Sequence, residues 1–496
     1  MCDDLRSRSV AIIGAGAAGA VAAAAFEAEK YFKKIRVFER RESPGGTWIY
    51  DPSTPPKLPL QPGSLPRDTD PRLAIPSDLP KTTSPNHQER YAQTPIYDSL
   101  TTNVPSIAMS FSDIPFPYGP FVPHHIARQY VELYFAYHKV DAHLSLNTTV
   151  EDLTLVPSPN SGSERWKLTL RKHDPVQNRD TWWEEIFDAV VLANGHYSIP
   201  FIPEVKGLAE YMSLFPNRVT HSKTYRSPFT FCSKKVLVVG NSASGHDVTA
   251  ELVQAAHLPV YQSRRSRSRW DGPEPPPGIA WKAIIKEFLP SGRIVFEDDT
   301  HLDDVDSVVY CTGYKASYPF WNAKKNGGPL YDYEANKLNH TYLHTFFRDF
   351  PTTLAIVGMP RVLTFRSFEY QATALARIFS GRDGGRLVRK GKEDMIRWES
   401  EREERCSREG KKFHDIEWET GETWEWLEEL YRIAGLPLLS GEGRIPPVLG
   451  KEVRWALENI RKYPEPGKDG GNSEDIMADD EWVVVGNDKK DLLAFI

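Results

Sequence analysis

The sequence predicts an α/β protein with two Rossmann-like dinucleotide-binding domains. Three observations lead to this prediction. A glycine-rich turn joins an apolar strand to a helix near the N-terminus, a second such turn follows near residue 240, and a buried strand run that ends in glycine follows each turn. Strands that alternate with helices in this way are typical of parallel sheets covered by helices.

The first unit begins with an apolar strand over residues 10–13 and continues through a glycine turn into an alanine-rich helix that runs toward residue 31. A second strand follows over residues 35–39. In a dinucleotide fold, the first glycine makes the tight turn, the second lets the backbone approach a pyrophosphate, and the third lets helix and strand pack closely. The candidate cofactor-binding residues of this turn are Gly14, Gly16, Ala18 and Gly19.

Glu39 lies twenty residues beyond Gly19, at the end of the second strand. A carboxylate at this position can accept hydrogen bonds from ribose hydroxyls. It would also repel a 2′-phosphate, so this site suits FAD or NAD rather than NADP. The alternatives are an ordinary glycine turn and a surface glutamate at a strand end.

The second unit has a strand over residues 236–239, a glycine turn, a helix to about residue 256 and a strand over residues 260–262. Ser242 takes the place of the middle glycine, which still permits a close approach and adds a hydroxyl. The candidate cofactor-binding residues of this turn are Gly240, Ser242, Ser244 and Gly245.

The second unit differs from the first in the residues that follow its second strand, which are Ser263, Arg264 and Arg265. Guanidinium groups offer charge and forked donors, which a ribose 2′-phosphate requires. This site is therefore predicted to bind NADPH. The alternative is a basic surface patch or localisation signal that includes Arg267 and Arg269.

One chain with an acidic first site and a basic second site most economically holds FAD and NADPH, with hydride passing between them. Disulfide reductases use the same pair of folds but need two nearby cysteines. The chain has no C-x-x-C spacing, and its four cysteines stand at positions 2, 232, 311 and 406. Metal and acyl-enzyme motifs are not indicated either, so dioxygen or an electron-carrying protein is the predicted acceptor.

The charge balance disfavours several classes of partner. The chain has 61 Lys and Arg against 67 Asp and Glu, and its net charge of −6 argues against binding to nucleic acid or to an anionic membrane. The small and apolar run over residues 10–26 contains the ordered glycines, so we interpret it as a nucleotide-binding unit rather than a signal peptide. We expect a cytoplasmic protein without a membrane anchor.

Two strand runs divide the chain, residues 188–195 and 306–313, and each ends in a glycine turn, at Gly195 and Gly313. Residues 51–90 are rich in proline and are predicted to form an extended surface insertion, which could cover the site or mediate contacts in a homodimer. The predicted segments are residues 1–207 for the first part of the FAD domain, 208–317 for the NADPH domain, 318–465 for the second part of the FAD domain, and 466–496 for an acidic tail.

Further motifs occur in a specific order. Glu39 is followed by Gly45-Gly46-Thr47-Trp48, then by residues 101–105, by Phe111 with residues 113–117, and by residues 310–314. In this order the chain resembles the class B flavin-dependent monooxygenases, the flavin-containing monooxygenase family, in a fungal-type long form. The resemblance extends from residue 9 to about residue 460.

The signature of that family, F-x-G-x-x-x-H-x-x-x-(Y/F), is similar to residues 215–225. His221 and Tyr225 are in register, but Asn217 replaces the glycine. Asn tolerates left-handed backbone angles better than most residues, so the turn can survive the change. Because Baeyer–Villiger relatives end the signature with Trp, Tyr225 favours oxygenation of a soft nitrogen or sulfur.

The resemblance implies that NADPH reduces FAD, and that a flavin hydroperoxide then transfers one oxygen atom to the substrate. It also implies a catalytic amide at Asn103 beside the flavin and the nicotinamide, for which an Asn in the turn before Pro105 is the alternative. Core packing competes with the cofactor role for Trp48, Val150 and Gln371, and interdomain packing is favoured over acid-base catalysis for His221 and Tyr225. The remaining cofactor contacts that the resemblance implies are Gly46, Thr47, Trp48, Thr102, Val150, Gly313 and Gln371.

Three other functions stay open at this point. They are Baeyer–Villiger oxygenation of a ketone, electron transfer from NADPH to a partner, and binding without catalysis. The substrate itself does not follow from the fold.

Overall fold

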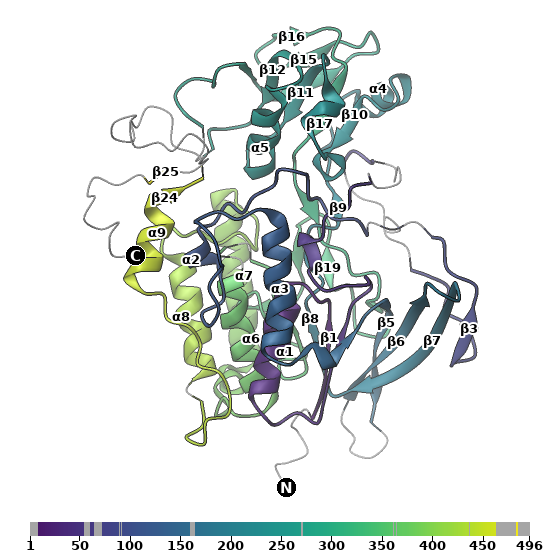
Figure 1. Ribbon diagram of the computed structural model, residues 1–496, viewed down its shortest axis with the longest axis vertical. Coiled ribbons are helices and arrows are strands. Elements are labelled where there is room, and N and C mark those ends of the chain that lie inside the picture. Colours follow the sequence, from purple (N-terminus) through teal and green to yellow (C-terminus); the bar gives the residue numbers. More distant parts are fainter. Residues whose placement is uncertain are drawn as a thin grey trace.

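Parallel strands that are buried on both faces form the centre of a seven-stranded sheet in the larger domain (Figure 1). The computed structural model describes residues 8–53, 60–63, 72–88, 90, 92–158, 164–268, 271–360, 362–363, 365–435, 437–462 and 483–484. The strand order is β21-β22-β23-β8-β1-β2-β4. Its strands are β1 (Ser9–Ile13), β2 (Lys34–Phe38), β4 (Leu144–Ser145), β8 (Ala189–Leu192), β21 (Thr341–Tyr342), β22 (Phe346–Phe347) and β23 (Leu354–Ile356).

Strands β23, β8, β1, β2 and β4 run parallel, and β21 and β22 are antiparallel at one edge. All five residues of β1 are buried, which is typical of a strand covered on both faces. Helix α1 (Ala17–Ala28) packs between the sheet and the helices α3 (His124–Tyr137) and α6 (Phe365–Phe379). Its alanine-rich sequence follows from this position, because every residue from Ala17 to Phe26 is buried.

Further helices lie on the outer side of α6 (Figure 1). Helix α7 contains a backbone break at Gly391, where φ is 74°. Helix α7 is largely exposed, and its buried residues are Leu387, Met395, Glu399, Arg402 and Cys406. These helices are α7 (Arg386–Glu409), α8 (Glu422–Ala434) and α9 (Lys451–Asn459).

The smaller domain has a five-stranded parallel sheet in the order β10-β17-β11-β12-β13. Helix α5 (Ala243–Leu252) follows β11, and α4 (Leu208–Leu214) precedes β10. The strands are β10 (Val219–His221), β11 (Lys235–Val239), β12 (His257–Ser263), β13 (Ile279–Lys282) and β17 (Ser307–Tyr310). An antiparallel sheet lies beside them, with β14 (Ile285–Phe288), β15 (Ile294–Phe296) and β16 (His301–Leu302).

Two short strands connect the domains. Strand β9 (Ile199–Pro200) leads into the smaller domain, β18 (Tyr314–Lys315) leads out of it, and the two pair antiparallel. All five strands of the parallel sheet lie between residues 219 and 310, within the predicted segment 208–317. The fold class is therefore confirmed: the protein is α/β with two Rossmann-like domains, and the domain boundaries stay predictions.

A four-stranded antiparallel sheet in the order β3-β7-β6-β5 forms a lobe beside the larger domain. The proline-rich insertion supplies its edge strand β3, where few ladder hydrogen bonds are needed. The strands are β3 (Lys81–Thr83), β5 (Thr148–Pro157), β6 (Glu164–Asp174) and β7 (Arg179–Phe187). The remaining short elements are α2 (Ser106–Met109), β19 (Tyr331–Asp332), β20 (Lys337–Leu338), β24 (Ile460–Arg461) and β25 (Val483–Val484).

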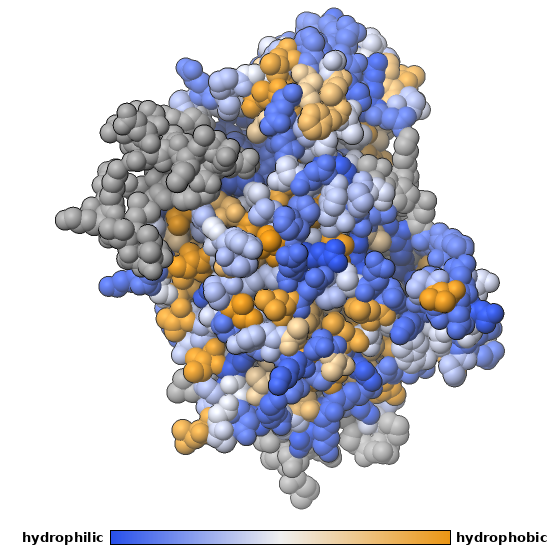
Figure 2. Space-filling view, viewed as in Figure 1, coloured by the Kyte–Doolittle hydropathy of each residue, from blue (hydrophilic) through white to orange (hydrophobic). Residues whose placement is uncertain are grey.

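Hydrophilic residues dominate the face of the molecule in Figure 2, and its hydrophobic residues form small separate groups. Within the described part of the chain, no helix is both long and apolar enough to cross a membrane. The predicted tail 466–496 lies outside the described residues except for 483–484, and so do parts of the predicted insertion, at 54–59, 64–71 and 89.

Candidate functional site

At two positions of the first glycine turn, only glycine fits without strain or a clash. Gly14 has φ of 110°, and a Cβ there would lie 2.5 Å from the carbonyl oxygen of Ala193. A Cβ on Gly19 would lie 1.9 Å from the carbonyl oxygen of Gly14. The turn therefore brings β1, α1 and β8 into backbone contact, as the three-glycine spacing predicts.

Gly16 and Gly46 pack backbone against backbone in front of helix α1. Gly16 is the N-cap of α1, and a Cβ on Gly46 would lie 2.6 Å from the Cα atom of Gly16. Both residues line a cavity of the larger domain. Because the free N–H groups of a helix N-terminus attract anions, the cavity at this helix end fits the pyrophosphate of a dinucleotide.

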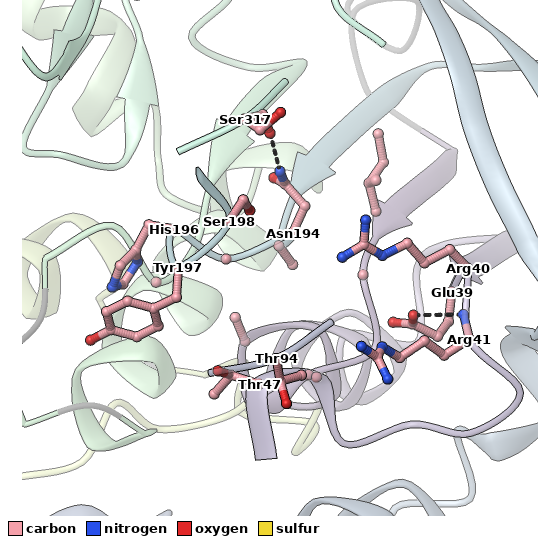
Figure 3. Close-up of a pocket in the computed structure, with 18 of the residues that line it drawn as sticks. Glu39, Arg40, Arg41, Thr47, Thr94, Asn194, His196, Tyr197, Ser198 and Ser317 are labelled. Atoms are coloured by element: carbon pink, nitrogen blue, oxygen red, sulfur yellow. Dashed lines mark hydrogen bonds between the residues drawn. The ribbon is translucent and has the colours of Figure 1, made fainter. Parts of the chain in front are cut away.

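Glu39 lies at the end of β2, where its carboxylate reaches the same cavity (Figure 3). Its Oε2 accepts a hydrogen bond of 2.8 Å from the backbone N–H of Ala15, and its Oε1 accepts one of 2.9 Å from Arg41. Each carboxylate oxygen is thus held by one hydrogen bond, and Glu39 as a whole is 6% exposed. The carboxylate is thus held in one orientation at the place predicted for a ribose contact.

The cavity opens at the carboxyl ends of four parallel strands. Gly14 follows β1, Glu39 follows β2, Asn194 follows β8 and Gly358 follows β23. Ligands of open α/β sheets bind at this edge. Of the predicted residues, those that line the cavity are Gly14, Gly16, Ala18, Glu39, Gly46, Thr47, Trp48 and Val150.

Sequence reasoning missed several polar residues of the cavity. Asn194 donates from Nδ2 to the carbonyl oxygen of Ser317 at 2.9 Å (Figure 3), while its Oδ1 is buried without a hydrogen-bond partner. The Oε1 atom of Gln93 is also buried without a partner, and Gln93 lines the same cavity. Two polar side chains with an unsatisfied acceptor each therefore lie in the wall of one cavity. The position of Asn194 directly after a buried strand was the signal that could have identified it.

Three other predicted residues lie outside the lining of the cavity. Asn103 is exposed, and Thr102 is buried with its Oγ1 accepting a hydrogen bond of 3.0 Å from Val122. Gln371 is fully buried in α6, where its Oε1 accepts a hydrogen bond of 2.9 Å from the backbone N–H of Gly358. Gln371 therefore acts on a lining residue, and cofactor roles for these three stay predictions.

The second glycine turn repeats the backbone of the first. Gly240 has φ of 114°, and a Cβ there would lie 2.8 Å from the carbonyl oxygen of Cys311. A Cβ on Gly245 would lie 2.1 Å from the carbonyl oxygen of Gly240. Ser242 is the N-cap of α5, with φ of −84° and ψ of −171°, and Ser244 lies in the first turn of that helix. This extended conformation is open to any residue, so a serine replaces the middle glycine without strain.

The basic segment after β12 is only partly as predicted. Ser263, which precedes the two arginines, is buried, and its hydroxyl donates to the carbonyl oxygen of Ala283 at 2.8 Å. Arg264 stacks its guanidinium over the ring of Trp281, with 3.3 Å between the Cζ atom and the ring centre. Arg265 is exposed, and Arg269 lies outside the described residues.

The signature segment supports domain packing. Asn217 has φ of 70°, in the left-handed region that favours glycine and that Asn tolerates. His221 accepts at Nδ1 from the N–H of Lys223 at 3.1 Å and contacts the carbonyl oxygen of Gly313 through Nε2 at 3.0 Å. Burial lowers the pKa of His221 to about 3. A histidine that is neutral and saturated in this way does not act as a general acid or base.

Tyr225 lies at the junction of the two domains. Its hydroxyl donates to Oε2 of Glu251 at 2.7 Å, and its ring packs edge-on against Tyr97 with 5.5 Å between the ring centres. Burial raises the pKa of Tyr225 far above its usual range. These contacts favour packing over proton transfer.

Among the described residues, no group of three metal-ligating side chains is present, and three cysteines, at positions 232, 311 and 406, are free. The two turns, and the cavity at the first of them, define the class of protein as one with two dinucleotide-binding domains.

The comparisons with known proteins give the family. A family model described as flavin-binding monooxygenase-like matches residues 83–270 and 278–435, and one described as an NAD(P)-binding Rossmann-like domain matches residues 12–60. The chain is 30% identical over 405 residues to flavin-containing monooxygenase FMO GS-OX-like 4 of Arabidopsis thaliana, covering 79% of each chain. It is also 30% identical over 433 residues to flavin-containing monooxygenase iboF of Amanita muscaria, covering 76% of this chain and 79% of that one.

Among solved structures, S-allyl-L-cysteine S-oxygenase from Allium sativum superimposes with a TM-score of 0.72 at 26% identity, covering 91% of this chain and 92% of that one. Tmm from Pelagibacter shares the fold, with a TM-score of 0.65 at 23% identity, covering 91% of this chain and 89% of that one. The chain belongs to the flavin-containing monooxygenase family. Family membership agrees with the predicted cofactors, FAD and NADPH, and the protein is a flavin-dependent monooxygenase.

Proposed function

We propose that the protein transfers one atom of dioxygen to a soft sulfur or nitrogen atom of a small molecule and prefers NADPH to NADH as the reductant. In the balanced reaction, substrate, O₂, NADPH and H⁺ give the oxygenated substrate, water and NADP⁺. FAD, when bound, accepts hydride from the nicotinamide and delivers electrons to dioxygen. The supporting observation is a pair of glycine turns of the same backbone geometry, with an acid after one and arginines after the other.

The residues of the first turn are proposed to hold FAD. The N-terminus of α1, which begins after Gly16, would meet its pyrophosphate, and the oriented carboxylate of Glu39 would accept from its ribose. Val150 from β5 would border the adenine, and Asn194 and Gln93 would be polar side chains in the wall of the site. A group held by backbone and by fixed side chains is retained through many reaction cycles.

The residues of the second turn are proposed to hold NADPH. The Gly240–Gly245 turn presents the N-terminus of α5 to its pyrophosphate, and Arg264 and Arg265 would contact the 2′-phosphate. Because of its place in the family motif, Asn103 is also proposed to supply an amide near the nicotinamide.

Water exclusion is assigned to the aromatic side of the cavity. Trp48 packs edge-on against Phe365 with 6.2 Å between the ring centres, and Phe365 stacks on Phe111 at 5.4 Å. Both Trp48 and Phe365 line the cavity. An apolar wall of this kind limits proton access and so limits the release of hydrogen peroxide in place of product.

Two observations support sulfur or nitrogen as the target. The neighbour of highest similarity described above is named an S-oxygenase, and Tyr225 ends the signature where Baeyer–Villiger relatives carry Trp. Tyr225 packs between the domains and does not line the cavity. It is therefore proposed to indicate the subclass that oxygenates sulfur or nitrogen, without contacting the substrate.

The test measures oxygen uptake, NADPH loss and ¹⁸O incorporation with a thioether, a tertiary amine and a cyclic ketone as separate substrates. We expect one labelled oxygen atom per NADPH in a sulfoxide or an N-oxide. A labelled ester from the ketone alone would favour Baeyer–Villiger chemistry. Turnover only with an artificial electron acceptor, without label in any product, would identify an electron-transfer reductase and contradict the proposal.

A further inference from the structure

A buried carboxylate lies beside the arginine that is proposed to bind the 2′-phosphate. The residue is Asp271, which is 7% exposed. Its Oδ2 accepts three hydrogen bonds: from Nδ2 of Asn241 at 2.6 Å, from Nη1 of Arg264 at 3.2 Å and from the backbone N–H of Ser268 at 2.8 Å.

These three donors come from two different segments. Asn241 belongs to the second glycine turn, whereas Arg264 and Ser268 belong to the segment after β12. Asn241 also donates to the carbonyl oxygen of Ser266 at 2.7 Å, and Arg267 donates from Nε to the carbonyl oxygen of Asp271 at 3.1 Å. Asp271 therefore fastens the basic segment to the turn that would hold the pyrophosphate.

Arg264 is held at three points, one of which is its contact with Asp271. Its backbone N–H donates to the carbonyl oxygen of Lys282 at 3.1 Å, which continues the pairing of β12 with β13. Its guanidinium lies on the ring of Trp281, and its Nη1 contacts Asp271. Arg has five N–H donors, so one hydrogen bond to Asp271 leaves the others for a ligand.

A carboxylate near a predicted phosphate site is unfavourable by charge alone, since like charges repel. A positional benefit can offset this repulsion. An arginine side chain carries about 2 kcal/mol of rotamer entropy, and an arginine that is already held in place loses less of it when the ligand binds.

We propose that Asp271 is a positioning residue for nucleotide selection: by holding Arg264 on Trp281 and against the second glycine turn, it increases the affinity for a ribose 2′-phosphate. This inference rests on the proposed use of the second turn for NADPH. According to this inference Asp271 strengthens phosphate binding, whereas its negative charge alone would weaken it.

The experiment uses the FAD-loaded protein and measures binding by isothermal titration calorimetry with two probes, adenosine 2′,5′-bisphosphate and adenosine 5′-monophosphate. The probes differ only in the 2′-phosphate. We expect Asp271→Ala to weaken bisphosphate binding about tenfold, or about 1.4 kcal/mol, and to change monophosphate binding less than about twofold. Asp271→Asn keeps an acceptor oxygen and is expected to lose less, about threefold.

A matched control is Asp303→Asn, which removes the same charge from an exposed ion pair with Arg293 in the same domain, where Nε and Oδ1 are 2.7 Å apart. We expect no change with either probe. Melting temperatures of all variants distinguish local effects from a loss of folding.

Tighter or unchanged bisphosphate binding by Asp271→Ala would overturn the inference, because charge would then outweigh position. Equal weakening of both probes would also overturn it, since that result marks a structural role. If the unaltered protein bound both probes equally, the assignment of the second turn to NADPH would fail first. Selective loss of the bisphosphate supports the inference.

Discussion

The two glycine turns have the same backbone but different surroundings. Gly14 and Gly240 have φ values of 110° and 114°, and each third glycine packs against the carbonyl oxygen of the first. The side chains after the second strand differ, with Glu39 in one domain and Arg264 in the other. Backbone geometry is therefore what the two turns share, and we expect a few side chains to select the cofactor.

The helices behind the turns differ in burial as well. Every residue of α1 from Ala17 to Phe26 is buried, whereas α5 buries only Gly245, Val248, Thr249 and Leu252. The proposed FAD site is thus built into the core of the larger domain, and the proposed NADPH site lies on a domain with a more exposed helix. This arrangement suits one cofactor that stays and one that exchanges in each reaction cycle.

The largest expected effects come from filling the third glycine of each turn. In Gly19→Ala, the new Cβ would lie 1.9 Å from the carbonyl oxygen of Gly14, and in Gly245→Ala it would lie 2.1 Å from that of Gly240. Such overpacking costs about 1–3 kcal/mol or more. We expect Gly19→Ala to be purified without flavin, and Gly245→Ala to keep flavin but lose NADP⁺ binding, as measured by flavin absorbance and by calorimetry.

Gly119→Ala is the control for this pair, because no atom lies within 4 Å of the position where its Cβ would be. Loss of both cofactors in both variants would show that the two sites are not independent and would break the comparison.

The next effect concerns the charge after each second strand. Arg264→Ala should lower the ratio of kcat/KM for NADPH over NADH by about 10- to 100-fold, because a charge-assisted hydrogen bond contributes about 1.5–3 kcal/mol. Arg265→Ala should lower it less, since Arg265 is exposed, and the double variant should shift preference toward NADH. Equal use of NADPH and NADH by the unaltered enzyme would refute the assignment.

A smaller effect concerns the strand that follows each turn. After β8, the segment is held by the amide of Asn194, which does not titrate. After β17, the carbonyl oxygen of Gly313 contacts the imidazole of His221, which can titrate. Burial lowers the pKa of His221 to about 3. Because the folded state favours neutral His221, its contribution is fully present above its unfolded pKa of about 6.5. It is lost as the pH falls from there toward 3.

His221→Gln tests this difference, since Gln has donors and acceptors but does not titrate. Below pH 6.5, the stability advantage of the unaltered protein over the variant should shrink by up to about 1.4 kcal/mol per pH unit. Scanning calorimetry between pH 7.5 and 5 measures it. A difference that is constant with pH would mean that His221 titrates normally.

The smallest effect is expected at the middle position of the second turn. Ser242 and Gly16 have nearly equal backbone angles, with φ of −84° and −78°. Ser242→Gly should therefore change NADP⁺ affinity by less than about threefold, within the few tenths of a kcal/mol that a Gly replacement costs at an N-cap. A larger loss, measured by calorimetry, would show that the hydroxyl itself binds the cofactor.

The sequence predicted the local part of each site and missed the long-range part. Glycine spacing fixed the two turns and Glu39 because all of these residues lie within one strand-turn-helix-strand unit. Asn194 and Gln93 reach the FAD cavity from distant segments, so spacing could not bring them together. Asp271 lies close in sequence to Arg264, but its hydrogen bonds depend on how the loop folds back onto Asn241.

The directions in which side chains point could also not be predicted from the sequence. Ser263 stands at the position expected for a phosphate contact, but its hydroxyl bonds the carbonyl oxygen of Ala283 from the strand end next to it. Gln371, for which a flavin contact and core packing were the two interpretations, is buried and accepts a hydrogen bond from Gly358, and its flavin contact stays a prediction. The register of a strand and the rotation of a buried helix decide such cases.

The paired strands β9 and β18 have a mechanical consequence. Two chain segments cross between the domains, and Tyr314 and Lys315 pair with Pro200 and Ile199 in a single narrow ribbon. At the level of the backbone such a ribbon is a single pivot, because both covalent paths keep their length when it bends. Tilting the smaller domain about it would also separate side chains that pack across the junction, such as Tyr225 and Tyr97.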